Sequence, residues 1–232
     1  VRSCGRRRRA PLGAVVRAIL TDYEARSPAV LSNAGYGKIK EPLLRFTAFF
    51  RALNASAPNG RFMDSYFNDP RAPGGYVPLG FMSFPLNQTG QQPLYSSSVF
   101  NFFSPSFAPP GAMAAAGLVA PELEITDGSY SISIPNTFVD FLYRNTASLP
   151  APPSGPSPFI ELDYSTFLPN AQNPTALVDQ LNLIFCGGQM APTTRSQILA
   201  AEQALVAGTS DKERVQIGIH LTVVSPSGAT QK

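Results

Sequence analysis

The sequence predicts a mainly α-helical protein, in which six or seven helices pack like a bundle around a long irregular segment rich in Pro, Gly and Phe. Apolar residues recur at helical spacing in several stretches, whereas only one run, YSISI at 130–134, resembles a strand. The 23 prolines are about twice the usual share, which indicates long loops.

The first two helices are expected at 11–26 and 38–53. In the first, apolar residues repeat every three or four positions, at Leu12, Val15, Val16, Ile19 and Leu20. The second has the clearest apolar stripe of the chain, and its Pro42 falls near the first turn, where a helix tolerates proline.

Residues 54–111 predict an irregular segment, with no more than a turn or two of helix near 98–103. Its aromatic residues are expected to pin it across the helices as part of the core. If the rings are exposed instead, they form a carbohydrate or polymer surface. The rings concerned are Phe100, Phe102, Phe103 and Phe107.

The remaining helices are expected at 136–147, 175–185, 194–206 and 211–224. Asn136 suits an N-cap, Gly187 and Gly188 suit the C-terminal end of the second of these helices, and Pro226 stops the last.

Charge is concentrated at the start of the chain. Five of the 18 basic residues lie in the first nine positions, and acidic residues slightly outnumber basic ones in the rest. Residues 1–10 are therefore expected to form a basic disordered tail, and 11–232 a single mostly helical domain. A tail of this kind can bind nucleic acid or anionic membrane, but a solvated end is the simpler interpretation, and we expect no nucleic-acid partner.

Several classes of site and segment are excluded by residue content. With only Cys4, Cys186 and His220 available, the chain cannot assemble a disulfide framework or a Cys/His site for zinc or haem. We expect no cofactor and no metal site. No apolar run is long enough to span a membrane, and the first residues lack the pattern of a signal peptide.

Glu122 and Glu124 are the first candidates for chemistry. Two nearby carboxylates can serve as general acid and base, or bind a hard cation such as calcium. However, residues two apart on a helix point in different directions, and acidic residues after Pro121 also fit an ordinary helix start.

A second set of candidate binding residues combines Lys38, Glu41 and Arg45 with Asn101 of the aromatic segment. Lys38 and Lys40, which flank Glu41, can bind an anionic group. Glu41 and Arg45 have the spacing of an ordinary i, i+4 ion pair. Asn101 is expected to be buried and to tie irregular backbone through its amide, with ligand contact as the alternative. His220, the one possible histidine base, lies beside residues typical of a packing surface.

Five stretches resemble, in order and spacing, the C-terminal half of the DUF1800 family, a group of large bacterial proteins of unassigned biochemistry. They include GKIKEPLLRFTAFFRAL and SSSVFNFFSPSFAPPG, and they cover residues 37–53, 96–111, 117–126, 176–190 and 214–232. Family members are usually about twice this length and begin with an export signal. The resemblance therefore implies that the chain is the C-terminal part of a longer protein.

The resemblance also implies a periplasmic or extracellular location and a partner of the DUF1501 type. Two hypotheses for function remain open. In the first, the chain is a structural or binding module of an exported bacterial protein that acts with a partner. In the second, it belongs to an exported hydrolase or other envelope enzyme whose site lies partly in an N-terminal half.

Overall fold

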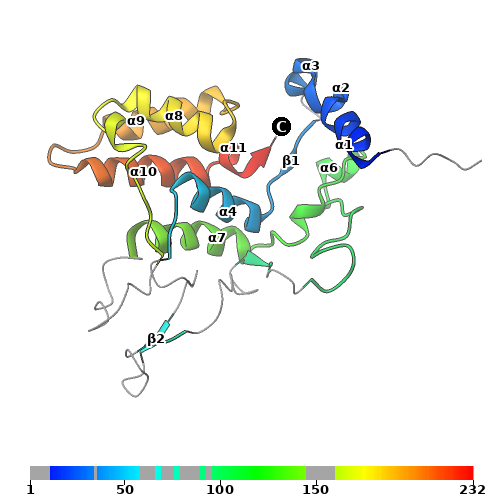
Figure 1. Ribbon diagram of the computed structural model, residues 1–232, viewed down its shortest axis with the longest axis horizontal. Helices are drawn as coiled ribbons and strands as arrows, with labels where there is room; N and C mark the ends of the chain where they lie inside the picture. Colours follow the sequence, from blue (N-terminus) through cyan, green and yellow to red (C-terminus); the bar gives the residue numbers. More distant parts are fainter. Residues whose placement is uncertain are drawn as a thin grey trace, which may run out of the picture. The chain divides into compact units, whose positions relative to one another are not determined.

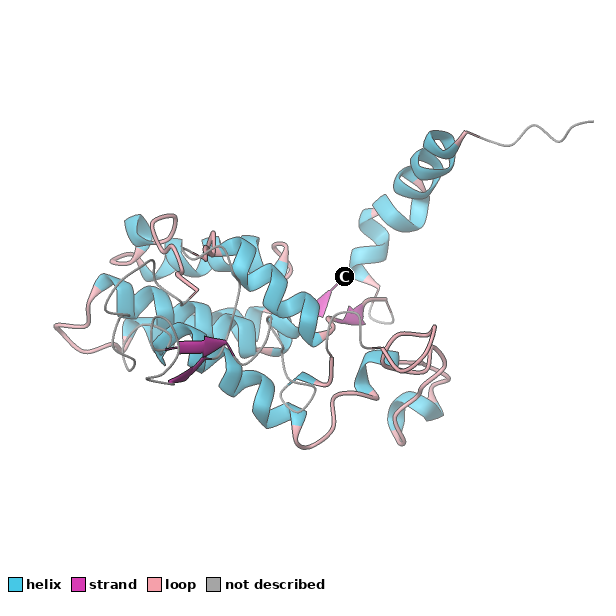
Figure 2. Cartoon of the chain, turned by 60° about the horizontal axis from the view of Figure 1, so that its bottom comes forward, coloured by secondary structure: helices cyan, strands magenta, loops and turns pink. Residues whose placement is uncertain are grey.

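The computed structural model confirms the mainly α-helical class (Figure 2). It describes residues 11–33, 36–57, 66–68, 76–78, 89–91, 96–144 and 160–231. The basic start of the chain, with Cys4, lies outside the described residues. Contacts divide the chain into a smaller unit, Val1–Lys38 with Lys232, and a larger unit, Ile39–Gln231.

The described helices of the smaller unit are α1 (Leu12–Thr21), α2 (Tyr23–Arg26) and α3 (Pro28–Ser32). The sequence predicts one helix over 11–26, whereas the structure interrupts it at Asp22. The Asp22 carboxylate accepts the backbone N–H of Glu24 at 2.9 Å and so begins a new helix. No residue of α1 is buried.

The rest of the chain alternates helices with short turns and strands. In chain order the elements are β1 (Lys38–Ile39), α4 (Pro42–Ala52), β2 (Tyr66–Asn68), β3 (Tyr76–Pro78), α6 (Ala112–Ala115), the 3-10 helix η1 (Pro121–Leu123), α7 (Tyr130–Val139), the π-helix η2 (Asp140–Arg144), the 3-10 helix η3 (Leu168–Asn170), α8 (Pro174–Cys186), α9 (Pro192–Gln203), α10 (Asp211–Val224), α11 (Pro226–Ala229) and β4 (Thr230–Gln231). Strand β1 pairs with β4, and β2 pairs antiparallel with β3.

Helix α10 lies at the centre of the larger unit, in contact with α7, α8 and α9, while α4 contacts α8 (Figure 1). Aromatic rings join α4 to α7 and η2. Phe46 stacks on Phe138 with 4.3 Å between ring centroids, and Phe50 meets Phe141 edge to face at 4.9 Å. These four side chains are buried and belong to one continuous apolar core.

The helices of the C-terminal part were well predicted because local signals mark their ends. Ser210 and Glu213 form a reciprocal capping box at the start of α10. The Asn173 side chain accepts the N–H of Ala176 at the start of α8, and Gly187 adopts the left-handed conformation just after its end.

Residues 130–134, the run that resembles a strand in sequence, open helix α7. The Asp127 carboxylate accepts the N–H groups of Ser129 and Tyr130 at 2.8 and 3.0 Å, which satisfies donors that a helix start leaves free. Helical spacing then buries Ile134 and Phe138 in the core. The helix expected from Asn136 therefore begins six residues earlier.

Three further expectations need correction. Residues 98–103 form turns and bends in place of helix. The helix expected at 38–53 begins only at Pro42, because Lys38–Ile39 pairs as a strand. The antiparallel pair β2–β3 was not predicted, since three-residue strands carry too little alternation to be recognised.

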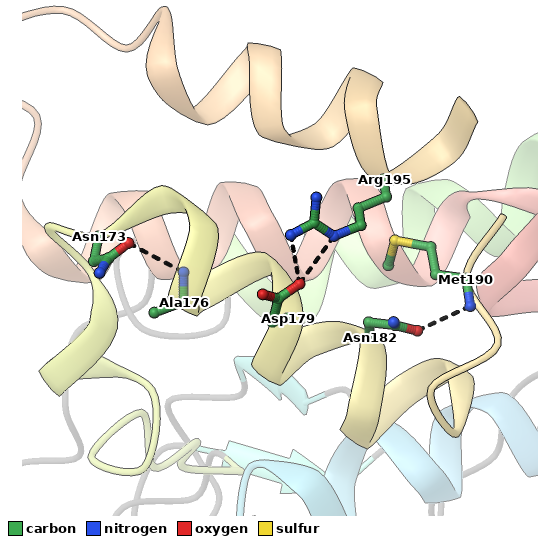
Figure 3. A network of polar contacts seen from close by, with 6 residues as sticks. All are labelled: Asn173, Ala176, Asp179, Asn182, Met190 and Arg195. Atoms are coloured by element: carbon green, nitrogen blue, oxygen red, sulfur yellow. Dashed lines mark hydrogen bonds and ion pairs between the residues drawn. The ribbon is translucent and has the colours of Figure 1, made fainter. Parts of the chain in front are cut away.

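Side chains of α8 organise the connection to α9 (Figure 3). The Asn182 amide oxygen accepts the N–H of Met190 at 2.9 Å, and Arg195 of α9 donates to the carboxylate of Asp179 at 2.6 and 2.9 Å. Among the described helices, none is long and apolar enough to cross a membrane.

The close approach of Gly228 to the backbone of Thr222 predicts that Gly228→Ala destabilises the protein. An added Cβ would lie 2.2 Å from the carbonyl oxygen of Thr222, so α11 must shift away from the end of α10. We expect the free energy of unfolding, measured by denaturant titration, to fall by about 1–3 kcal/mol. Gly128→Ala is the control, since no atom lies within 4 Å of its Cβ position. Equal losses in both variants would contradict the packing argument.

Candidate functional site

A tight turn exposes the most accessible apolar side chains of the central segment. In this turn, Ser98–Asn101, the two end residues form an isolated antiparallel bridge. The Ser98 hydroxyl accepts the N–H of Phe100 at 3.1 Å, and Asn101 closes the turn with φ of 70°. Asn tolerates this left-handed conformation better than most residues. We call Ser98–Asn101 the aromatic turn.

The tip of the aromatic turn is exposed. Val99 is 94% and Phe100 62% accessible to solvent, while Phe102, Phe103 and Phe107 are half-buried. The expectation that these four phenylalanines belong to the core is therefore wrong. At least for Phe100, the alternative of an exposed ring holds.

The Glu41 carboxylate, at the start of α4, holds the aromatic turn in place. Its Oε2 accepts the Asn101 side-chain amide at 3.2 Å and the Gln91 side-chain amide at 2.7 Å. Gln91 is 1% exposed, and its amide oxygen accepts the N–H of Leu43 in the first turn of α4. Three segments distant in sequence thus share one hydrogen-bonded cluster. Asn101 is itself exposed, contrary to expectation.

Glu124 is a second attachment, and it does not act together with Glu122. The Glu124 carboxylate accepts the backbone N–H of Ser104, just beyond the aromatic turn. Glu122 is 7% exposed, whereas Glu124 is exposed, so their side chains occupy different surroundings. The arrangement provides backbone positioning and no paired acid and base.

Lys40 and Arg45 bind carbonyl groups at helix ends. Lys40 Nζ donates to the carbonyls of Phe185, in the last turn of α8, and Gly228 of α11, at 2.7 and 3.2 Å. Arg45 donates to the carbonyl of Val223, in the last turn of α10, at 2.7 Å. The last carbonyls of a helix lack helical partners and carry negative dipole charge, so both cations are well placed.

Burial affects both cations. It lowers the pKa of Lys40, and it lowers the pKa of Arg45 to about 10. The ion pair expected between Glu41 and Arg45 is wrong, because Glu41 binds amides while Arg45 binds a carbonyl and lies over the Phe138 ring. Lys38 is exposed in β1.

His220 packs against an aromatic side chain. Its ring meets that of Tyr143 edge to face at 5.8 Å between centroids, and burial lowers the pKa of His220. In the described part of the chain, no three His, Cys, Asp or Glu residues are grouped so that they could hold a metal ion.

The smaller unit carries an exposed apolar stripe on α1 and an open pocket of about 470 Å³. The stripe consists of Leu12, Val15, Val16, Ile19 and Leu20. The pocket is lined by Ala18, Ile19, Asp22, Glu24, Ala25 and Tyr36. Two of these described lining residues, Asp22 and Glu24, are acidic.

Sequence reasoning missed Gln91 and Glu202. Gln91 lies in a polar, irregular stretch, and no local signal marks it. Glu202 is fully buried on α9, and its position four residues after the apolar Ile198 gives the signal that could have found it.

The cluster predicts the effect of Glu41→Gln. The charged oxygen that accepts both Asn101 and Gln91 would be replaced by a neutral amide oxygen, which is a weaker acceptor. We expect faster hydrogen exchange in residues 96–104 and a loss of about 1 kcal/mol in unfolding free energy. Glu161→Gln, at an exposed side chain, is the control. Unchanged exchange in the Glu41 variant would show that the cluster does not hold the turn.

The cations at the helix ends predict the effect of Lys40→Met. The carbonyls of Phe185 and Gly228 would both lose a charged donor, and we expect the unfolding free energy to fall by about 2 kcal/mol. Arg51→Met removes an exposed cation from the last turn of α4 and should change it by less than about 0.5 kcal/mol. Denaturant titration of both variants is the measurement, and equal effects would contradict the assignment.

Comparison with known proteins identifies a family of unknown function. No curated protein and no solved structure matches the chain. The family described as "Protein of unknown function (DUF1800)" matches residues 6–227. This match spans both the aromatic turn and the helices that hold it, and the chain therefore belongs to the DUF1800 family.

Proposed function

We propose that this chain is a binding module that acts with a partner protein, and that the aromatic turn is its main contact. The observation that carries the proposal is the exposure of Val99 and Phe100 on a turn held by Glu41. Exposed single apolar residues are ordinary, but here two adjacent ones form the tip of a hydrogen-bonded turn.

A turn that is already ordered is well suited to binding, because it loses little conformational entropy when the partner binds. Aromatic side chains often dominate the energy of an interface when they enter a pocket on the partner. The sequence carries no charged residue from Gln88 to Val119. The tip of the turn, Val99 and Phe100, therefore fits an apolar pocket on the partner.

The polar residues of the site support binding more than catalysis. The side chains of Glu41, Gln91 and Asn101 hydrogen-bond to one another and to the start of α4. Their hydrogen-bonding capacity is thus used in positioning the turn. The competing hypothesis, an envelope hydrolase, has no specific observation among the described residues in its favour.

We further propose a partner of the DUF1501 type and a periplasmic or extracellular location. Both rest on the resemblance of the five sequence stretches to proteins that are commonly exported and encoded beside such a partner.

Phe100→Ala tests the proposal. The wild-type chain is titrated with a purified protein of the DUF1501 type by isothermal titration calorimetry. Removal of a ring that anchors the interface should raise Kd at least about tenfold. Because Phe100 is 62% exposed, the substitution should leave the melting temperature unchanged.

Leu183→Ala is the matched control, since Leu183 is an equally exposed apolar residue of α8, at 69%. Its affinity should equal that of the wild type. Equal weakening by both variants would point to a different surface, and no binding by the wild type would refute the proposed partner.

A further inference from the structure

Helix α9 is attached to the larger unit by few apolar side chains. Only Ile198 and Glu202 of α9 are buried, at 4% and 0% exposure, and Leu199 is packed partly against the core. The ion pair of Arg195 with Asp179 lies at the surface (Figure 3). Surface ion pairs stabilise weakly. The attachment of α9 therefore depends mainly on its two buried side chains, Ile198 and Glu202.

The Glu202 carboxyl group lies in an apolar contact between helices. Its Oε1 is 3.0 Å from the position that a Cβ on Gly218 of α10 would occupy, and Leu177 and Leu181 of α8 border the same position. Glycine at 218 thus leaves room for the carboxyl group. Both carboxyl oxygens are buried and have no hydrogen-bond partner among the described residues.

Two ionisable groups face Glu202. Arg214 of α10 attracts it electrostatically, and the Nε of Arg214 is itself buried without a partner. Tyr143 of η2 is the other, and its pKa is raised to about 12, mainly by burial. From α8 the contacts are the apolar Leu177 and Leu181. None of the described residues donates a hydrogen bond to the Glu202 carboxyl group in this position.

We propose that Glu202 is a pH-dependent latch for α9: the neutral carboxyl group packs against Gly218, and its ionisation loosens α9 from α8 and α10. The physical reason is the cost of burying a charge that accepts no hydrogen bond, which exceeds that of burying a neutral carboxyl group and which the attraction of Arg214 only partly offsets. The device uses the fold itself and is independent of the partner binding proposed for the aromatic turn.

The direction of the effect follows from the pKa. Burial raises the pKa of Glu202 to about 7, while Arg214 partly opposes the rise. In the detached helix the group has an ordinary pKa of about 4.3. The closed state therefore binds the proton more tightly. Its advantage is fully present below about pH 4 and is lost as the pH rises through about 7.

Hydrogen exchange measured by mass spectrometry at pH 6 and pH 8, corrected for intrinsic rates, tests the latch in the full chain. In the wild type we expect protection of the α9 amides to fall about tenfold between these pH values. In Glu202→Gln, which keeps the shape but cannot ionise, protection of α9 should not change with pH. Asp179→Asn breaks the surface ion pair of α9 and should retain the tenfold change.

A second variant tests the proposal even if Glu202→Gln fails to fold. Arg214→Gln removes the cation that lowers the pKa of Glu202, so the midpoint of the loss of protection should move to higher pH. The proposal is overturned by a wild type whose α9 protection is independent of pH. It is equally overturned by a pH dependence that persists in Glu202→Gln, or by a midpoint that stays or falls in Arg214→Gln.

Discussion

The packing of the larger unit depends on two cations at the start of α4 that donate hydrogen bonds to helix ends. Carbonyls in the last turns of α8 and α10 have no donor within their own helices, and Lys40 and Arg45 donate hydrogen bonds to them. Lys40 also binds α11 through Gly228, and its backbone N–H donates to Ala229. Because these donors come from one short segment, the C-terminal end of α8 and the junction of α10 with α11 must both lie beside the start of α4.

The same segment also holds two described parts of the central segment, Gln91 and the aromatic turn. Between the two cations, Glu41 binds the side-chain amides of Gln91 and Asn101. Fixing a turn costs conformational entropy, and hydrogen bonds to a helix that is already packed offset part of that cost. Val99 and Phe100 remain exposed to solvent.

Helix α9 is attached less firmly than α4. Where α4 contributes buried phenylalanines to the core, α9 contributes Ile198 and a buried acid, Glu202. Elements with few buried apolar contacts open more readily than the core around them. The unit thus combines a firmly held centre with a peripheral helix whose attachment depends on a titratable side chain.

The sequence by itself determined the helical class, the helices α8 and α10, and the family, because caps, apolar spacing and ordered motifs are local signals. The capping box of Ser210 and the left-handed Gly187 are of this kind. The tertiary structure alone decided that Glu41 binds Asn101 sixty residues away and that Glu202 is buried. In each of these cases the deciding partner lies on another element, so no local pattern of residues encodes the contact.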